Sequence, residues 1–271
     1  MTVDQLQLRD FPERIVCLVE EPTEILYALG EEERIVGISA YTVRPERAAE
    51  EKPVVSAFIG GSIDKIRALE PDLIIGFSDI QADLARDLIK HNEQVLIYNQ
   101  RTLQDILDVV VSIGRLVGRE ADARELASGY IEGLRAASRR TEDMEKRPKV
   151  YFEEWPEDPT ITGIRWVSQL VEIAGGIDVF SDRSHGKAAS DRSVSHEDVI
   201  AAEPDIIIGS WCGKPVEKES IRERPGFDDV PAVQNDEIHE IDSSLILQPG
   251  PACLTDGLAR LEEIIRGWEP G

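Results

Sequence analysis

Two pairs of neighbouring glutamates are the residues of this chain whose spacing most suggests cation binding. Glu20 and Glu21 follow the apolar run RIVCLV, and Glu153 and Glu154 stand 133 residues further on. Four converging carboxylates could hold a hard cation. Alternatively they are acids at helix N-termini or ion-pair partners of arginines; the candidate arginines are Arg44, Arg101 and Arg165. No histidine cluster accompanies the glutamates, so we expect ion pairs and no metal site.

Aromatic residues follow several apolar runs, where strands would end. Tyr41 and Phe58 do so in the first half, and Trp155, Trp166 and Trp211 in the second. Such aromatics are either core residues or walls of a site for a large, flat, amide-decorated or conjugated ligand. The residues that we expect to bind the ligand are Glu20, Glu21, Tyr41, Phe58, Ser78, Asp79, Arg101, Glu153, Glu154, Trp155, Trp166, Trp211, Cys212 and Gln248.

Sequence motifs of common enzymes are absent. There is no phosphate-binding G-x-x-x-x-G-K-[ST], no G-x-G-x-x-G after a strand and no G-x-S-x-G elbow. The four histidines are isolated, and Cys212 has no evident histidine base. Three widely spaced cysteines without Cys-x-x-Cys argue against a disulfide framework and against a zinc site. We therefore expect no catalytic residue, no catalytic cofactor and no enzymatic activity.

One phrase is written twice in the chain. EPDLIIGFSD (70–79) returns as EPDIIIGSWC (203–212), an offset of 133 residues. SIDKIRAL from Ser62 and SHEDVIAA from Ser195 match at the same offset, at which Glu20 and Glu21 correspond to Glu153 and Glu154. Matches at one offset indicate two related lobes.

Each lobe alternates short apolar runs with helical patterns, which predicts parallel strands connected by helices. The expected fold is α/β: two Rossmann-like β/α lobes with mostly parallel sheets, joined by a single long α-helix, with a ligand cleft between the lobes. The expected boundaries are 1–118 for the N-terminal lobe, 119–148 for the connecting helix and 149–271 for the C-terminal lobe.

Charge and composition limit the partners. The net charge is −23, with only eight lysines, which repels nucleic acid and anionic lipid and is typical of proteins that work at high salt. The N-terminus lacks the features of a secretory signal, and free thiols fit a reducing compartment. We expect a cytoplasmic monomer, or an extracytoplasmic one if a signal has been removed.

The repeated pattern S-x-[DE]-x-[IV]-x-A-x-[EK]-P-D-[LI]-[IV], present in both lobes, resembles class III substrate-binding proteins of ABC transporters, from Arg14 to Trp268. RIVCLVEEPTEILYALGEEERIVGISAYTVRP and IRWVSQLVEIAGGIDVF are most similar to the cobalamin-binding branch. The resemblance implies that Tyr41 and Phe58 contact a corrin. It also implies that Asp64 and Glu197 pair with arginines of the transporter's membrane subunits, although helix capping alone would explain these acids.

The expected function is non-enzymatic binding of cobalamin or a related corrinoid, for ABC-type uptake or intracellular corrinoid handling. The implied partners are the small-molecule corrinoid and transporter permease subunits. Two alternatives remain open. One is a ferric-siderophore or haem binding protein of the same fold. The other is a metal-handling protein or enzyme that uses Glu20, Glu21, Glu153 and Glu154.

Overall fold

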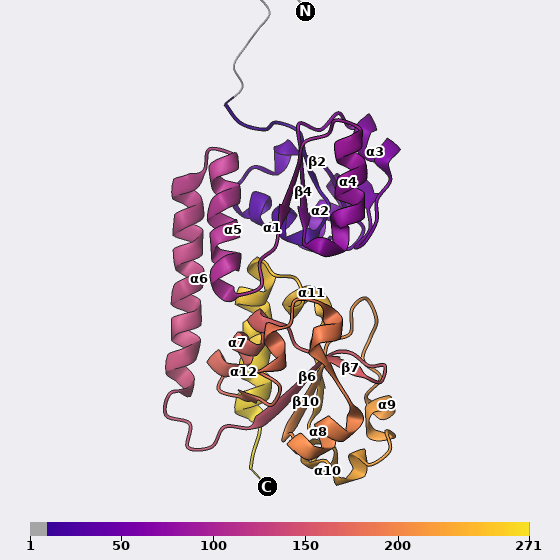
Figure 1. Cartoon of the computed structure of the whole chain (residues 1–271). Helices are drawn as coiled ribbons and strands as arrows, with labels where there is room; N and C mark the ends of the chain where they lie inside the picture. The colour runs from indigo at the N-terminus through magenta and orange to yellow at the C-terminus, as the bar shows by residue number, and fades with distance from the viewer. Residues whose placement is uncertain (1–9, 271) are drawn as a thin grey trace, which may run out of the picture. The chain divides into compact units, whose positions relative to one another are not determined.

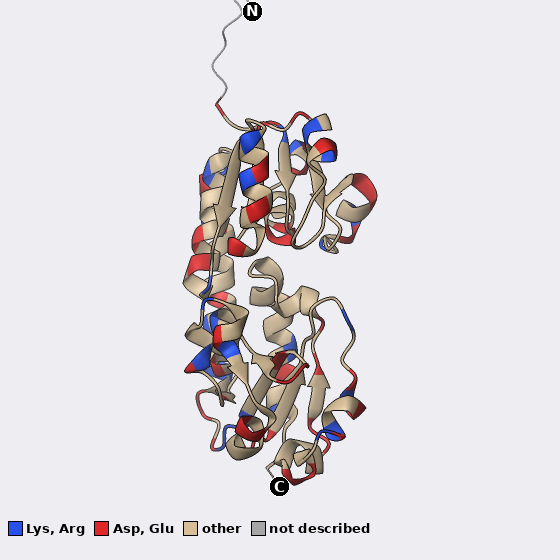
Figure 2. Ribbon diagram, turned by 45° about the vertical axis from the view of Figure 1, so that its right-hand side comes forward, with Lys and Arg blue, Asp and Glu red and all other residues tan. Residues whose placement is uncertain are grey.

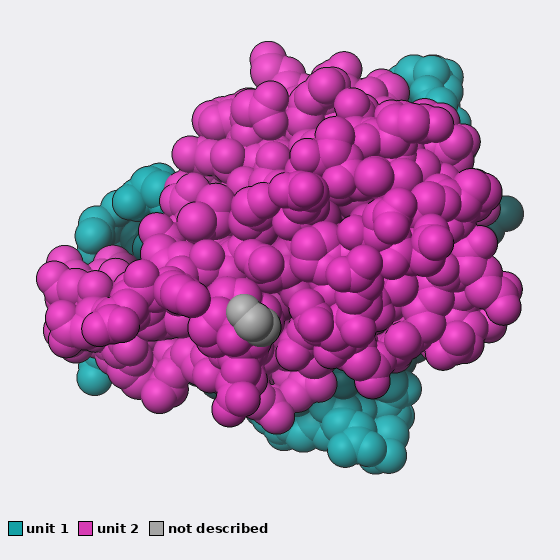
Figure 3. Space-filling model, turned by 90° about the horizontal axis from the view of Figure 1, so that it is seen from below, with its two compact units in different colours: residues 1–100, 104–128 teal, residues 101–103, 129–271 magenta. Residues whose placement is uncertain are grey.

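The computed structural model describes residues 10–270, in which the chain forms two compact units (Figures 1 and 3). Unit 1 comprises residues 1–100 and 104–128, and unit 2 comprises 101–103 and 129–271. The first nine residues, on which part of the expectation about a secretory signal depends, lie outside the described residues. No helix within 10–270 has the length and apolar character needed to cross a membrane.

Unit 1 contains a parallel five-stranded sheet in the order β3-β2-β1-β4-β5. Its strands are β1 (Ile15–Cys17), β2 (Ile35–Ser39), β3 (Val54–Ser56), β4 (Leu73–Phe77) and β5 (Val95–Tyr98). The connecting helices are α1 (Glu20–Ala28), α2 (Glu46–Glu51), α3 (Ile63–Ala68) and α4 (Ala82–Lys90). Every residue of β4 is buried, as its continuous apolar run predicts for a central parallel strand. The strand order 3-2-1-4-5 is that of a doubly wound, Rossmann-like sheet, which confirms the predicted fold of this lobe.

Unit 2 has a mixed sheet in the order β11-β10-β6-β7-β9, with β8 also paired to β6. Its strands are β6 (Lys149–Trp155), β7 (Thr160–Thr162), β8 (Ile177–Asp178), β9 (Ser193–Val194), β10 (Ile206–Gly209) and β11 (Ile238–Glu240). Its helices are α7 (Arg165–Ile173), α8 (His196–Ala202), α9 (Lys218–Arg222), α10 (Pro231–Gln234), α11 (Ser243–Ile246) and α12 (Leu258–Gly267). Strands β8, β6, β10 and β11 run parallel, whereas β7 is antiparallel to β6 and β9.

Two helices, α5 (Leu103–Leu116) and α6 (Glu120–Thr141), lie between the two sheets in chain order. Helix α6 ends seven residues before position 148, the end expected for the connecting helix. At its end the Thr141 hydroxyl donates to the Ile173 carbonyl at 3.1 Å, which ties this turn to α7 within unit 2. Acidic and basic residues alternate along the exposed helical faces (Figure 2), as in the Arg124–Glu120 and Arg135–Glu132 pairs of α6.

The duplicated EPD phrase has the same structural role in each unit. Glu70 and Glu203 both adopt φ +48°, a left-handed conformation that ends helices α3 and α8. The aspartate that follows then bonds to the backbone that begins the neighbouring strand. Asp72 accepts from Glu13 N (2.8 Å) and Arg14 N (2.9 Å), while a carboxylate oxygen of Asp205 accepts from Lys149 N (2.8 Å). The motif therefore sets strand register at the amino ends of the sheets.

Strand register also corrects one expectation from the sequence. Leu73 pairs with Ile15, and Ile206, its equivalent at the offset of 133, pairs with Val150. Residues of β1 are thus related to those of β6 by an offset of 135. Glu153 and Glu154 consequently do not correspond to the glutamates that begin α1. The physical reason is that the chain between the paired strands is two residues shorter in unit 2: Leu73 follows Ile15 by 58 residues, whereas Ile206 follows Val150 by 56.

Alanine substitution at the two EPD aspartates tests their role in register. We expect Asp72→Ala to lower the free energy of unfolding by about 2 kcal/mol and Asp205→Ala by about 1 kcal/mol, at about 1 kcal/mol per hydrogen bond. Urea denaturation followed by circular dichroism measures both. Asp83→Ala removes an exposed carboxylate that pairs with Arg86 in the first turn of α4 and, among the described residues, makes no contact with a strand end, and it serves as the control. A loss for Asp72→Ala no larger than for this control would contradict the proposed role.

Candidate functional site

The carboxyl-end loops of unit 1 expose apolar side chains. Tyr41 follows β2 and is 46 % exposed, Ile59 follows β3 and is 64 % exposed, and Ile80 follows β4. The half-buried Phe58 lies beside Tyr41 with ring centroids 6.3 Å apart and planes at 74°. Since these loops follow neighbouring parallel strands, they share one edge of the sheet. They give unit 1 an exposed apolar surface that a flat ligand could cover.

A buried glutamine holds this edge together. Gln81 Nε2 donates to the carbonyl oxygens of Leu18 (3.2 Å) and Phe58 (2.9 Å), while its Oε1 accepts from Phe77 N (3.0 Å). One amide therefore links the ends of β1, β3 and β4 and fixes the loop that carries Phe58. Nothing in the local sequence marks Gln81, because two of its three partners, Leu18 and Phe58, are 63 and 23 residues away.

Ser78 and Asp79 lie together at the end of β4. Ser78 has φ +59°, an uncommon conformation for a residue with a side chain, and one that is concentrated at functional sites. Its backbone N–H donates to the Tyr98 carbonyl at 2.7 Å, and its hydroxyl lies 3.2 Å from Asp79 Oδ1. The Ser78 hydroxyl also caps the turn by accepting from Ile80 N at 3.3 Å.

Glu20 and Glu21 form the first turn of α1 and are buried. Burial raises the pKa of Glu20 to about 7, and burial together with the charge of Glu20 raises the pKa of Glu21 to about 8. Among the residues that the structure describes, none makes a hydrogen bond to Glu21 Oε2. The helix dipole favours negative charge here, but the cost of removing two carboxylates from water is the larger effect.

In unit 2, Glu153 is part of a buried network. Arg224 donates to both of its oxygens, at 2.6 and 2.8 Å, and the side chains of both residues are nearly inaccessible to solvent. The Trp211 indole N–H donates to Oε1 at 3.0 Å, and the Tyr151 hydroxyl donates to Oε2 at 3.0 Å. Trp211 is itself buried. Glu153 and Trp211 are thus brought together, with the polar group of each already bonded within the unit.

Glu154 has the same kind of partner. Arg192 donates to its two oxygens at 2.5 and 3.1 Å and also to the Thr162 carbonyl, which links β6 to β7. With Glu153 and Glu154 both neutralised by arginines, the alternative of a four-glutamate metal centre loses half of its ligands. Within residues 10–270, no three His, Cys, Asp or Glu side chains are grouped so as to hold a metal ion.

The other two candidate tryptophans of unit 2 differ in exposure. Trp166, in α7, is buried and donates its indole N–H to the Ile246 carbonyl at 2.9 Å. Trp155, at the end of β6, is partly exposed and donates to Glu157 at 2.8 Å. The Lys214 ammonium lies 4.0 Å from the centre of the Trp155 ring. Trp155 is therefore an accessible aromatic residue at this carboxyl edge.

The remaining predicted residues lie at the ends of their elements. Arg101 is half-buried and follows β5, and Gln248 is half-buried and follows α11. Cys212 is exposed directly after Trp211. Asp64 and Glu197 are exposed in the first turns of α3 and α8, behind the capping serines Ser62 and Ser195. The two serines cap their helices, which confirms the capping interpretation. Asp64 and Glu197 lie in the first turns of these helices, where a negative charge is favourable.

Sequence reasoning did not identify the arginines that neutralise the buried acids, nor Lys214. Arg224 is 71 residues from Glu153, and Arg192 is 38 from Glu154. One signal in the sequence could have indicated these partners: a carboxylate within a predicted buried strand needs a buried cation beside it. That argument predicts that a partner exists without identifying it.

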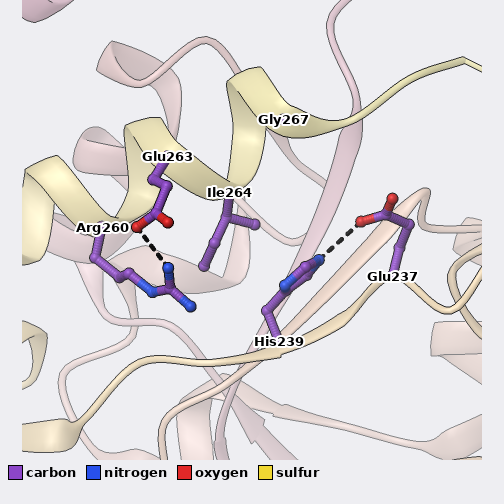
Figure 4. A pocket seen from close by; sticks show the side chains of 6 residues that line it. All are labelled: Glu237, His239, Arg260, Glu263, Ile264 and Gly267. Atoms are coloured by element: carbon purple, nitrogen blue, oxygen red, sulfur yellow. Dashed lines mark hydrogen bonds and ion pairs between the residues drawn. The ribbon is translucent and has the colours of Figure 1, made fainter.

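A hollow of about 290 Å³ lies between β11 and α12 of unit 2 (Figure 4). His239 Nε2 is 2.7 Å from Glu237, and Arg260 donates to Glu263 at 2.5 Å. The charged groups that line this hollow pair with one another. The candidate ligand residues described above lie elsewhere, most of them at the carboxyl edge of the sheet of their own unit.

Breaking the buried ion pair tests its structural role. We expect Arg224→Met to lower the free energy of unfolding by about 3–5 kcal/mol, because Glu153 is left buried and uncompensated. The double variant Glu153→Gln/Arg224→Met should lose less than Arg224→Met alone. Urea denaturation followed by tryptophan fluorescence reports the difference. Arg260→Met, at an exposed pair, is the matched control; equal losses for the two arginines would disprove a buried-charge effect.

The raised pKa values of Glu20 and Glu21 predict a pH dependence of stability. The folded chain binds more protons than the unfolded one, so this pair lowers stability as pH rises from about 5 to about 8.5. Glu20→Gln/Glu21→Gln should be close to the parent near pH 4.5 and should exceed its free energy of unfolding by several kcal/mol near pH 8.5. Denaturation at both pH values measures this. The exposed pair Glu46→Gln/Glu50→Gln should show no such trend, and a pH-independent difference for the buried pair would refute the assignment.

Comparison with known proteins finds relatives that are named as solute-binding proteins. The vitamin B12-binding protein of Vibrio parahaemolyticus is 28% identical over 247 residues, covering 89% of this chain and 86% of that protein. The crystal structure of a possible iron-binding (periplasmic solute-binding) protein from Staphylococcus epidermidis has a TM-score of 0.80 at 26% identity, covering 94% and 98% of the two chains. A periplasmic heme binding protein from Pseudomonas aeruginosa has a TM-score of 0.81 at 18% identity, covering 96% and 95%.

The family model described as periplasmic binding protein matches residues 15–245. This range contains both sheets, from β1 to β11, and all but one of the candidate ligand residues, the exception being Gln248. The chain therefore belongs to the periplasmic binding protein family.

Proposed function

We propose that this chain binds a corrinoid, cobalamin or cobinamide, through the carboxyl-end loops of its sheets. The observation that carries the proposal is the exposed apolar surface of unit 1. Within residues 10–270, Tyr41, Val43, Ile59 and Ile80 are four of the eight exposed large hydrophobic residues, and all four follow β2, β3 or β4. Exposed apolar side chains that gather on loops at one edge of a sheet are typical of ligand-binding surfaces.

Family membership determines the class of function. Periplasmic binding proteins are non-enzymatic solute-binding proteins, so this chain is a solute-binding protein and not an enzyme. The ligand is the proposed part. The 28% identity to a vitamin B12-binding protein over most of both chains favours a corrinoid, and the aromatic pair Tyr41–Phe58 provides ring faces and edges for a macrocycle.

The rest of the predicted site takes supporting roles in this proposal. Trp155 provides an aromatic contact in unit 2, while Trp211 and Glu153 hold the wall behind it through the buried network. The exposed Asp79 offers its carboxylate to the amide side chains of a corrinoid, while the buried Ser78 holds the turn that carries it. The two exposed acids Asp64 and Glu197 dock onto arginines of a transporter permease during uptake from outside the cytoplasm.

Haem or a ferric siderophore is the second candidate. The specific observation that favours it is the 26% identity to a possible iron-binding protein over 94% of this chain. The net charge of −23 opposes the uptake of strongly anionic siderophores. We therefore rank haem-like and corrinoid macrocycles above siderophores.

Calorimetric titration with cyanocobalamin tests the proposal. The parent protein should bind, and Tyr41→Ala/Phe58→Ala should raise the Kd at least about ten-fold, because each aromatic residue contributes roughly 1 kcal/mol or more to stacking. Val54→Ala removes an exposed apolar side chain at the amino end of β3 and should leave the Kd unchanged. Absence of heat with cyanocobalamin, together with binding of hemin, would replace the corrinoid by haem as the ligand.

A further inference from the structure

The sequence SWCGKP, which follows β10, forms a tight turn whose function the fold alone does not explain. The Lys214 backbone N–H donates to the Trp211 carbonyl at 3.3 Å, which closes a four-residue turn. Gly213 lies at φ +71° in this turn, a conformation that side chains disfavour. The turn therefore reverses the chain just past the carboxyl end of β10 and returns the lysine toward the strand ends.

The turn places the Lys214 ammonium against aromatic rings. Its Nζ is 4.0 Å from the centre of the Trp155 ring and 5.6 Å from that of Trp211. A cation over an indole face is attracted by the negative face of the ring. Glu157 holds the Trp155 ring in place by accepting from its indole N–H at 2.8 Å. The ammonium is thus positioned beside the accessible aromatic residue of this edge.

The charge of Lys214 is only weakly compensated by acids. The carboxylate paired with it, that of Glu157, is 4.0 Å away and 74 % exposed, while the lysine side chain is 39 % exposed. Such an exposed pair at the limit of contact contributes little. Arg192 and Arg224 differ, because each is buried and donates to both oxygens of a glutamate. Their charges are committed to the unit, whereas that of Lys214 is available to a ligand.

We propose that Lys214 is a specificity-determining residue that binds an anionic substituent, a phosphate or a carboxylate, of a planar ligand lying on Trp155. The inference deepens the proposed function and rests on it for the position of the ligand. A planar ligand with an anionic group keeps the ammonium paired while it covers the ring. A neutral planar ligand must displace the ammonium from the ring and gains no ion pair in return, so it binds less tightly.

Two corrinoids and hemin test this role. Cyanocobalamin carries a phosphodiester, dicyanocobinamide lacks it, and hemin carries carboxylates on a different macrocycle. Lys214→Met should weaken cyanocobalamin binding about five-fold and leave dicyanocobinamide unchanged or tighter, since an exposed ion pair is worth up to about a factor of five. Lys214→Arg should restore cyanocobalamin binding. The five-fold effect should shrink when salt is raised from about 50 mM to about 500 mM.

Lys218→Met removes the same charge four residues away, from the exposed helix α9, and is the matched control. Equal effects of Lys214→Met on both corrinoids, or no effect on either, would overturn the role of Lys214 while leaving corrinoid binding intact. If neither corrinoid binds but hemin does, with an affinity that falls in Lys214→Met and not in Lys218→Met, the proposed corrinoid function fails and the role of Lys214 stands. Hemin binding that is insensitive to Lys214→Met in that case, or binding of none of the three probes, overturns both.

Discussion

A strand buried on both faces can meet solvent only at its two ends, and this constraint determines where everything else in the protein can be placed. In β4 and β10 every residue is buried, so the polar groups of the repeated phrase gather before and after the strand. The amino ends carry the aspartates that set register, and the carboxyl ends carry the residues that can meet a ligand. Because parallel strands share one carboxyl edge, loops far apart in sequence gather there within each unit, and Gln81 joins three of them with one side chain.

The two copies treat buried acids differently. In unit 1 two carboxylates stand together at a helix N-terminus, without a cation in their first turn, and burial shifts their protonation into the neutral range. In unit 2 the carboxylates lie within β6 and are neutralised by Arg224 and Arg192. The first arrangement makes charge at one edge responsive to its surroundings, whereas the second makes a rigid wall. The carboxyl edges of the two sheets therefore differ in their electrostatic character, although the folds of the two units are similar.

Local sequence signals predicted the fold, but they predicted the candidate site only in part. The parallel strands and the helix starts could be predicted because their signals lie within a few neighbouring residues. These signals are the continuous apolar runs, the capping serines and the EPD phrase. The correspondence of the glutamate pairs was wrong, because the chain from β6 to β10 is two residues shorter than the chain from β1 to β4, and only the strand pairing reveals this. Trp166 and Trp211 were singled out together with Trp155, but only the structure separates buried tryptophans from the partly exposed one. Gln81 and Arg224 make their contacts across 63 and 71 residues, a distance that a single sequence does not encode.

The placement of the EPD aspartates has a consequence for how such a protein can change over time. Each aspartate accepts hydrogen bonds from backbone N–H groups of its own unit, at the end of the sheet opposite the ligand-facing loops. A loop at the opposite end can therefore be exchanged, lengthened or recharged without unsettling the alignment of the strands that carry it. The scaffold is in this sense modular, and new ligand preferences can be acquired by replacing one turn, such as that of Gly213, while the rest of the molecule is inherited unaltered.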